Sequence, residues 1–180
     1  MRRTAILMKN NVILTGFMGT GKTSLGKLLA TRLGRPFIDI DKKIEDENRM
    51  SIPKIFEQYG EEHFRALEKA AVKELSERRW LIIATGGGTI KDEENLNLLK
   101  NSGVMICLTT EPEEIFNRTA RRGERPVLDG GGNERLETIK KLLAERKKFY
   151  DRADYQVDTT NWSPIQIIED ICRYLKQFRS

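Results

Sequence analysis

The residues best suited to chemistry form a glycine-rich segment, residues 16–23, with the sequence GFMGTGKT. The segment fits the pattern G-x-x-x-x-G-K-[ST], and it lies between an apolar run and an amphipathic stretch of helical periodicity. Its glycines can adopt positive φ, which lets backbone N–H groups close around a phosphate. Lys22 would place a charge on the terminal phosphates, and the Thr23 hydroxyl could bind Mg²⁺. The segment therefore predicts binding of a nucleoside triphosphate, but it does not identify the acceptor.

Two aspartates, Asp39 and Asp41, stand two residues apart at the end of a second predicted strand, residues 36–40. Because side chains alternate along an extended chain, both carboxylates would point to the same side of it. Ligands of open parallel sheets bind beyond the carboxyl ends of the strands, so one acid could serve Mg²⁺ and the other a substrate hydroxyl. Asp41 also precedes a helical stretch, so a helix N-cap plus a surface acid is the structural alternative.

A predicted helix carries Arg65 and Glu68, which are neighbours at i,i+3 spacing. They form either a surface ion pair or a unit in which Glu68 holds Arg65 ready to bind a carboxylate.

The third apolar run, residues 81–84, leads into the sequence TGGG at residues 85–88. Consecutive glycines at a strand end allow a ligand to approach the backbone closely, although a loose turn would look the same. Because no acid ends this strand, we expect Asp39 to be the metal ligand.

Residues 121–133 form a polar stretch rich in arginine and glycine. The basic segment from Arg118 to Pro126 could close over ATP and bring an arginine to the transferred phosphoryl group. A solvated basic loop would have the same composition. Arg146 lies on the following long helix among lysines, and the pattern alone does not single it out. The single histidine, His63, is interpreted as an exposed helix residue, and the sequence holds no His/Cys cluster for zinc.

The composition fits one folded domain. The chain has 180 residues, of which 38% are hydrophobic and 33% charged, and these fractions exclude a disordered chain. Its formal net charge is +5. This charge suits either an anionic substrate or weak nucleic-acid binding. Cys107 and Cys172 form no CxxC pair, so we expect both to be buried thiols in a reducing cytoplasm. No apolar run approaches the roughly 20 residues that span a bilayer, and the apolar stretch at residues 5–8 is too short for a secretory signal.

Apolar runs alternate with amphipathic segments along the chain. Such alternation predicts an α/β fold with a parallel sheet between two layers of helices. Strands are expected at residues 12–15, 36–40, 81–84, 104–108 and 155–158. Helices are expected at residues 22–33, 52–59, 61–79, 93–101, 111–121 and 134–151, with a last helix that begins at residues 163–164.

Several of these motifs together resemble the shikimate kinase family. The resemblance is carried by GFMGTGKT, by D-x-D in FIDID, by IFEQYGEEHFRALE, by TGGG, by RPVL and by ERKKFYDRAD, and it covers roughly residues 11–164. It implies a three-layer α/β/α P-loop kinase fold of the nucleoside-monophosphate-kinase type, with a five-stranded parallel sheet. It also implies one domain over residues 1–180, with a substrate-binding region at about 41–68 and a lid at about 119–133. The implied reaction is ATP plus shikimate giving ADP plus shikimate 3-phosphate, a step of chorismate and aromatic amino acid biosynthesis.

The resemblance also implies a role for individual residues. The catalytic residues would be Lys22, Asp41 and Arg125. Thr23 and Asp39 would bind Mg²⁺. ATP would be bound by Gly19, Thr20, Gly21, Lys22, Thr23, Ser24, Arg118 and Arg125. Shikimate would be bound by Asp41, Arg65, Gly86, Gly87, Gly88 and Arg146.

Two segments depart from the family pattern. Where some members carry an arginine near the adenine, this chain reads Asn161-Trp162-Ser163, and Trp162 could stack on the base. The end of the lid, DGGGN at residues 129–133, is rich in glycine. Neither departure touches the residues expected to bind the acceptor.

We expect the chain to act in the cytoplasm as a monomer on ATP and shikimate, with no nucleic-acid or membrane partner. Two rival hypotheses stay open. One is a kinase of another small metabolite, such as gluconate, with the same fold. The other is an ATP-binding switch or RNA-associated protein that uses its basic lid for a partner, which predicts salt-sensitive RNA binding.

Overall fold

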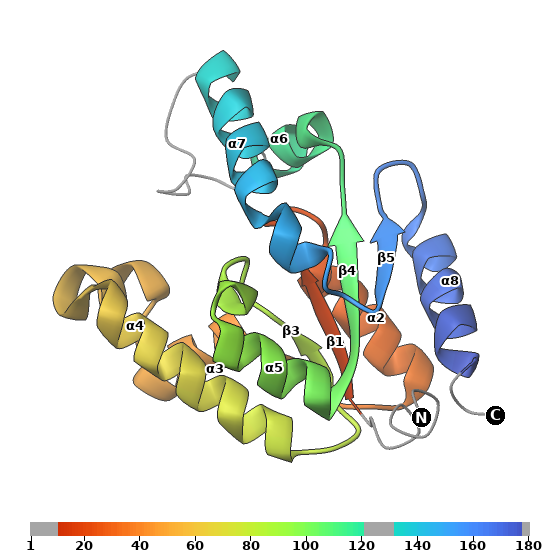
Figure 1. The fold of residues 1–180 in the computed structure, drawn as a ribbon, viewed down its shortest axis with the longest axis horizontal. Helices are drawn as coiled ribbons and strands as arrows, with labels where there is room; N and C mark the ends of the chain where they lie inside the picture. Colours follow the sequence, from red (N-terminus) through yellow and green to blue (C-terminus); the bar gives the residue numbers. More distant parts are fainter. Residues whose placement is uncertain (1–10, 121–131, 178–180) are drawn as a thin grey trace.

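Five short strands form one parallel sheet in the order β2-β3-β1-β4-β5 (Figure 1). The strands are β1 (Asn11–Gly16), β2 (Phe37–Asp39), β3 (Ile82–Ala84), β4 (Gly103–Thr109) and β5 (Tyr155–Asp158). The central strand, β1, pairs with two neighbours, so Leu14 lies opposite both Ala84 and Ile106. This computed structural model describes residues 11–120 and 132–177. The predictions for the first ten residues and for Arg125 in the lid lie outside the described residues.

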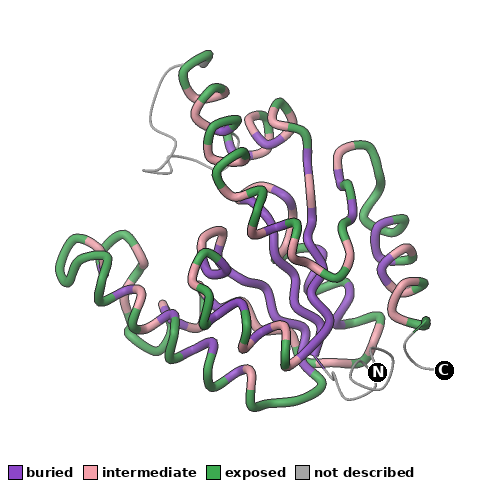
Figure 2. Tube along the Cα trace, in the orientation of Figure 1, coloured by how far each residue is buried: buried purple, intermediate pink, exposed green. Residues whose placement is uncertain are grey.

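Alternating side chains of β1 face two different layers of helices. Leu14 points into a buried cluster with α2 (Lys22–Leu33) and α8 (Pro164–Lys176), whereas Ile13 points into a cluster on the other face. That second face is covered by α4 (Ile52–Glu77), α5 (Glu93–Ser102) and α7 (Gly132–Tyr150). Figure 2 shows the resulting pattern, in which burial is concentrated on the strands and on the inward sides of the helices. The predicted three-layer α/β/α fold with a five-stranded parallel sheet is confirmed.

The remaining elements lie beyond the ends of the strands. They are α3 (Ile40–Asn48), α6 (Pro112–Ala120) and a single 3₁₀ turn, η1 (Thr89–Lys91). The predicted break at Gly60 is confirmed, because this residue has φ 80° and ψ 171° and bends α4. None of the described helices combines the length and the apolar character that a membrane crossing requires.

Three sequence predictions about local structure were wrong. The second strand ends at Asp39 and α3 begins at Ile40, so Asp41 lies in the first turn of a helix rather than on an extended chain. Helix α7 begins at Gly132, two residues before the expected start, within the segment assigned to a glycine-rich loop. Cys172 is only half-buried, whereas Cys107 is buried as expected, because α8 covers the edge of the sheet rather than its centre.

Candidate active site

The phosphate loop follows β1 at the centre of the sheet, where the direction of the chain connections reverses. Its three glycines have positive φ, as predicted. The values are 138° for Gly16, 81° for Gly19 and 96° for Gly21. A Cβ on Gly16 would lie 2.3 Å from the Leu108 carbonyl oxygen, so only glycine fits there. Gly21 is the N-cap of α2 and supplies no side-chain acceptor, which leaves the first N–H groups of that helix available to an anion.

Lys22 folds back over this loop. Its Nζ donates hydrogen bonds to the carbonyl oxygens of Gly16, at 2.8 Å, and Phe17, at 2.9 Å. The ammonium group is therefore held at the mouth of the loop, where a terminal phosphate would compete for it. The Thr20 hydroxyl donates to the Phe17 carbonyl oxygen at 2.8 Å and serves the loop itself, while Ser24 is exposed on the first turn of α2.

Arg118 supports the loop from α6. Its guanidinium donates to the Gly19 carbonyl oxygen at 3.4 Å and to the Thr159 carbonyl oxygen at 2.9 Å, and it pairs with Glu114 at 2.8 Å. Trp162, which the sequence offered as a base-stacking residue, lies in the same β5–α8 connection as Thr159 and is 48% exposed. Arg118 thus ties α6, the phosphate loop and the β5–α8 connection together.

Asp39 caps α3 with one carboxylate oxygen and contacts Thr23 with the other. Its Oδ1 accepts hydrogen bonds from the backbone N–H groups of Asp41, at 3.1 Å, and Lys42, at 3.3 Å, and so caps α3. Its Oδ2 accepts a hydrogen bond from the Thr23 hydroxyl at 2.7 Å. This pair of oxygens beside the phosphate loop fits Mg²⁺, which commonly takes one or two protein oxygens and completes its shell with phosphates and water. Within residues 11–120 and 132–177, no three His, Cys, Asp or Glu side chains form a fuller cage.

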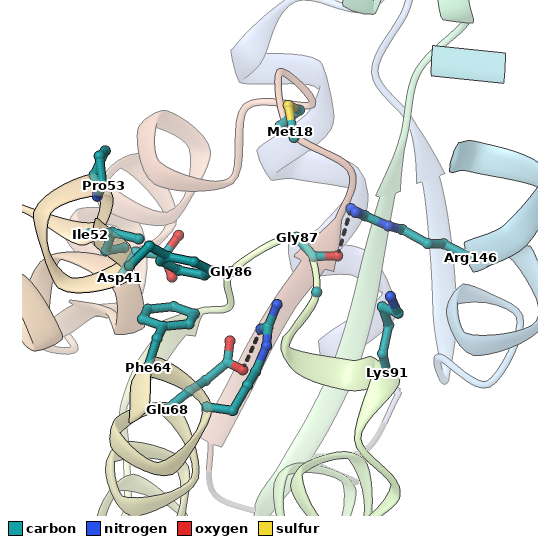
Figure 3. Close-up of a pocket in the computed structure, with 13 residues that line it drawn as sticks. Met18, Asp41, Ile52, Pro53, Phe64, Glu68, Gly86, Gly87, Lys91 and Arg146 are labelled. Atoms are coloured by element: carbon teal, nitrogen blue, oxygen red, sulfur yellow. Dashed lines mark hydrogen bonds and ion pairs between the residues drawn. The ribbon is translucent and has the colours of Figure 1, made fainter. Parts of the chain in front are cut away.

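Next to the loop lies an open pocket of about 420 Å³ with a mixed apolar and charged lining (Figure 3). Its lining residues come from the loop, α3, α4, the glycine turn, η1 and α7. They are Met18, Asp41, Ile52, Pro53, Phe56, Phe64, Arg65, Glu68, Gly86, Gly87, Gly88, Lys91 and Arg146. Every residue predicted to bind the acceptor therefore lines one pocket.

Asp41 has an unusual protonation equilibrium. Burial, followed by the nearby charges of Asp39 and Glu68, raises the pKa of its carboxyl group from 3.8 to about 6, against the opposing effect of Lys22. No described group donates a hydrogen bond that would stabilise the ionised carboxylate. A carboxyl group with a pKa near 6 is ionised at neutral pH and can still accept a proton, as a general base must.

Glu68 holds Arg65 from a buried position. The Glu68 side chain is 2% exposed, and its Oε2 accepts a hydrogen bond from Arg65 Nη1 at 2.8 Å. Its other oxygen, Oε1, accepts a hydrogen bond from the buried Thr89 hydroxyl at 2.6 Å. Glu61 pairs with Arg65 from the exposed side at 3.1 Å. Of the two interpretations that the sequence allowed, the structure supports the one in which Glu68 positions the arginine.

Arg146 reaches the pocket from α7. Its Nη1 donates to the Gly87 carbonyl oxygen at 3.1 Å, and its guanidinium carbon lies 5.1 Å from the centre of the Phe17 ring. Tyr150 donates its hydroxyl hydrogen to the same Gly87 oxygen at 3.2 Å, and burial raises the pKa of this tyrosine to about 12. Figure 3 shows the Arg146 side chain extending from α7 to the Gly87 carbonyl oxygen at the edge of the pocket.

The three glycines of the turn each touch charged groups. A Cβ on Gly86 would lie 2.6 Å from Asp41 Oδ1, and a Cβ on Gly87 would lie 3.2 Å from Arg146 Nη1. A Cβ on Gly88 would lie 3.6 Å from both terminal nitrogens of Arg65. The turn is therefore a contact surface for the acid and both arginines, which a loose turn would not provide.

Sequence reasoning missed several residues of this site. The apolar wall (Ile52, Pro53 and Phe56) follows a helical spacing that is equally typical of a core, so no local signal marked it. Thr89 donates a hydrogen bond to Glu68, and Tyr150 donates one to the Gly87 carbonyl oxygen. Both contacts join segments that are distant in sequence, so no local pattern indicates them. His63, which the sequence placed outside the site, is exposed on α4 as expected.

The sheet order, the phosphate loop and the adjoining charged pocket define a P-loop phosphotransferase that acts on a small molecule. The chain belongs to the shikimate kinase family, whose model matches residues 18–176. It is 44% identical to the shikimate kinase of Pelotomaculum thermopropionicum, over 93% of this chain and 96% of that one. Among solved structures it resembles shikimate kinase from Acinetobacter baumannii in complex with shikimate, with 35% identity, a TM-score of 0.87 and 97% coverage of both chains. A gluconokinase from Sinorhizobium meliloti, at 19% identity and a TM-score of 0.65, shares the fold alone.

Proposed function

We propose that this chain transfers the γ-phosphate of ATP to the 3-hydroxyl of shikimate, giving ADP and shikimate 3-phosphate. The observation that supports this most directly is the pocket beside the phosphate loop, in which Asp41 and two arginines, Arg65 and Arg146, converge on one turn. Shikimate carries one carboxylate and three hydroxyl groups on a small ring. The arginines suit the carboxylate, and the aspartate suits a hydroxyl group.

On the nucleotide side, the loop N–H groups and Lys22 would bind the β- and γ-phosphates. Lys22 exchanges its contacts with two backbone carbonyls for contacts with phosphate oxygens, so its charge is already placed before ATP binds. Thr23 and Asp39 would hold Mg²⁺, which supplies charge neutralisation on the phosphates. Gly19, Thr20, Gly21 and Ser24 would complete the loop, with Arg118 beneath it and Arg125 reaching in from the lid.

On the acceptor side, the position of the substrate is fixed from two directions. Arg65, held by Glu68, and Arg146, held at Gly87, would bind the carboxylate, while Gly86 and Gly88 line the contact surface. Asp41 would accept a hydrogen bond from the attacking hydroxyl and take its proton as the phosphoryl group is transferred. Such fixed placement converts an encounter of two molecules into a reaction within one complex, which lowers the entropic part of the barrier.

The domain organisation that we propose follows from this arrangement. One domain carries the loop at 16–23, an acceptor region at about 41–68 and a lid at about 119–133 that excludes water during transfer. We further propose that the chain acts as a monomer in the cytoplasm, where its thiols at Cys107 and Cys172 stay reduced.

A coupled ADP-release assay with a panel of acceptors tests the proposed function. We expect ADP release that depends on added shikimate and on Mg²⁺, and no release above background with gluconate. Arg65→Ala should raise the KM for shikimate by about 100-fold or more while changing the KM for ATP little, because a lost charged hydrogen-bonding partner costs several kcal/mol. ADP release that depends on gluconate, or shikimate kinetics that are unchanged in Arg65→Ala, would refute shikimate as the acceptor.

A further inference from the structure

Lys91 is a cation of the acceptor pocket that the roles described above do not use. It is the last residue of η1, and its backbone N–H donates to the Gly88 carbonyl oxygen at 3.0 Å. Its exposed side chain lines the pocket, and Figure 3 shows it extending from η1 toward the place where Arg146 enters. Among the described residues, no carboxylate lies within ion-pair distance of its ammonium group.

The stem of Lys91 lies close to the guanidinium group of Arg65. A Cβ on Gly88 would lie 3.9 Å from Lys91 Cδ and 3.6 Å from the terminal nitrogens of Arg65, so both side chains pass the same point of the glycine turn. Neighbouring contacts fasten η1 in place. The Thr89 hydroxyl donates to Glu68, and the Asn95 amide donates to the Thr89 carbonyl oxygen at 3.2 Å.

With Lys91, the side chains that line the pocket carry a net positive charge. The cationic lining residues are Arg65, Arg146 and Lys91, against the acids Asp41 and Glu68, so three positive charges minus two negative charges leave an excess of one. Without Lys91, the pocket would be formally neutral. Glu61, the other partner of Arg65, has a side chain that is 66% exposed, so water screens its charge more strongly.

We propose that Lys91 is a specificity-determining residue for the acceptor: its ammonium group supplies the positive excess that attracts the carboxylate of the substrate. This inference rests on the proposed function and extends it. Arg65 and Arg146 present rigid guanidinium groups for directed hydrogen bonds, whereas a lysine acts as a mobile point charge. Its effect is therefore on the capture of an anionic acceptor rather than on the transfer step.

The test compares Lys91→Met, which keeps the stem and removes the charge, with Lys91→Arg and Lys91→Glu. At low ionic strength (about 20 mM), we expect Lys91→Met to raise the KM for shikimate about 3- to 10-fold, with kcat within about twofold of the wild type. Lys91→Arg should restore the wild-type KM, and Lys91→Glu should raise the KM further. In about 0.5 M KCl the difference between wild type and Lys91→Met should shrink to less than about twofold, because salt screens exposed charges.

Two controls separate this effect from altered folding. Lys176→Met removes another exposed lysine charge, from α8, far in the fold from η1 (Figure 1), and should leave the KM for shikimate unchanged. Shikimate methyl ester, which has no carboxylate, should serve wild type and Lys91→Met with the same KM. An unchanged KM for shikimate in Lys91→Met at low salt, or a KM difference that persists in high salt or with the ester, would overturn the inference. Absence of shikimate-dependent ADP release in the wild type would instead overturn the proposed function.

Discussion

Replacing Asp41 with asparagine should stabilise the protein while it removes activity. Burial raises the pKa of this carboxyl group from 3.8 to about 6, which means that the folded protein holds the ionised form at a cost. Each pKa unit corresponds to about 1.4 kcal/mol, so the shift of about two units destabilises the folded state by about 3 kcal/mol at pH 7.5. Asp41→Asn keeps the shape of the side chain and removes this cost.

The stability advantage of Asp41→Asn over the wild type should decrease as the pH falls. Because the pKa of Asp41 is higher in the folded than in the unfolded chain, the folded state binds the proton more tightly. The wild type therefore recovers stability as the pH falls through about 6, and the recovery is complete below the unfolded value of 3.8. The advantage of Asp41→Asn should fall from about 3 kcal/mol at pH 7.5 to about 1.5 kcal/mol at pH 5.

Urea unfolding at pH 7.5 and pH 5 measures this difference, and the ADP-release assay measures the accompanying loss of kcat, expected to be about 100-fold or more. Asp46→Asn is a matched control on the same helix, because Asp46 is exposed and pairs with Lys42 on the surface. It should change the free energy of unfolding by less than about 1 kcal/mol. An Asp41→Asn protein that is no more stable than wild type at pH 7.5, or whose advantage grows toward pH 5, would refute this reasoning.

Three further predictions concern the supports of the site. Thr89→Val, which keeps the volume but removes the hydroxyl donor to buried Glu68, should lower the free energy of unfolding by about 1.5–3 kcal/mol and raise the KM for shikimate more than it lowers kcat. Thr89→Ser should restore both values, and equal effects of the two variants in urea unfolding and steady-state kinetics would argue against this role. Gly26→Ala should destabilise α2 by about 1–3 kcal/mol in thermal or urea unfolding, although alanine favours helices, because the new Cβ would lie 2.3 Å from Cε2 of Phe37. Lys22→Met should lower kcat at least about 100-fold at saturating ATP in the ADP-release assay, and a near-normal kcat would exclude it from the transfer step.

The phosphate loop shows what local sequence is able to specify. Its glycines were expected to have positive φ, and they do, because the constraint arises from the backbone of each residue and its neighbours. The alternation of strands and helices was likewise predicted from periodicity, whereas the order of the strands in the sheet was not predicted. The lid and Arg125 stay predictions, since they lie outside the described residues.

The acid pair shows where local reasoning failed. Asp39 and Asp41 were expected on one face of an extended chain, but the side chain of Asp39 accepts hydrogen bonds from two N–H groups and starts α3 at Ile40. Asp41 still lies beside the phosphate loop, because both a strand end and the first turn of the following helix occur at that edge of the sheet. The right location was thus predicted from the wrong local conformation.

Residue types and spacing were enough to predict the alternating strands and helices, the phosphate loop and the candidate residues Asp41 and Arg65, because these features depend on backbone preferences and short-range patterns. The kinase type of the fold and the role of Arg146 were expected only from the resemblance to a family. The partners of those residues depended on packing between distant segments. Glu68 meets Thr89 across 21 positions, and Arg146 meets Gly87 across 59. No local pattern in the sequence predicts these contacts, because they depend on how the helices pack on the sheet. The same packing places Lys91 in the pocket and raises the pKa of Asp41.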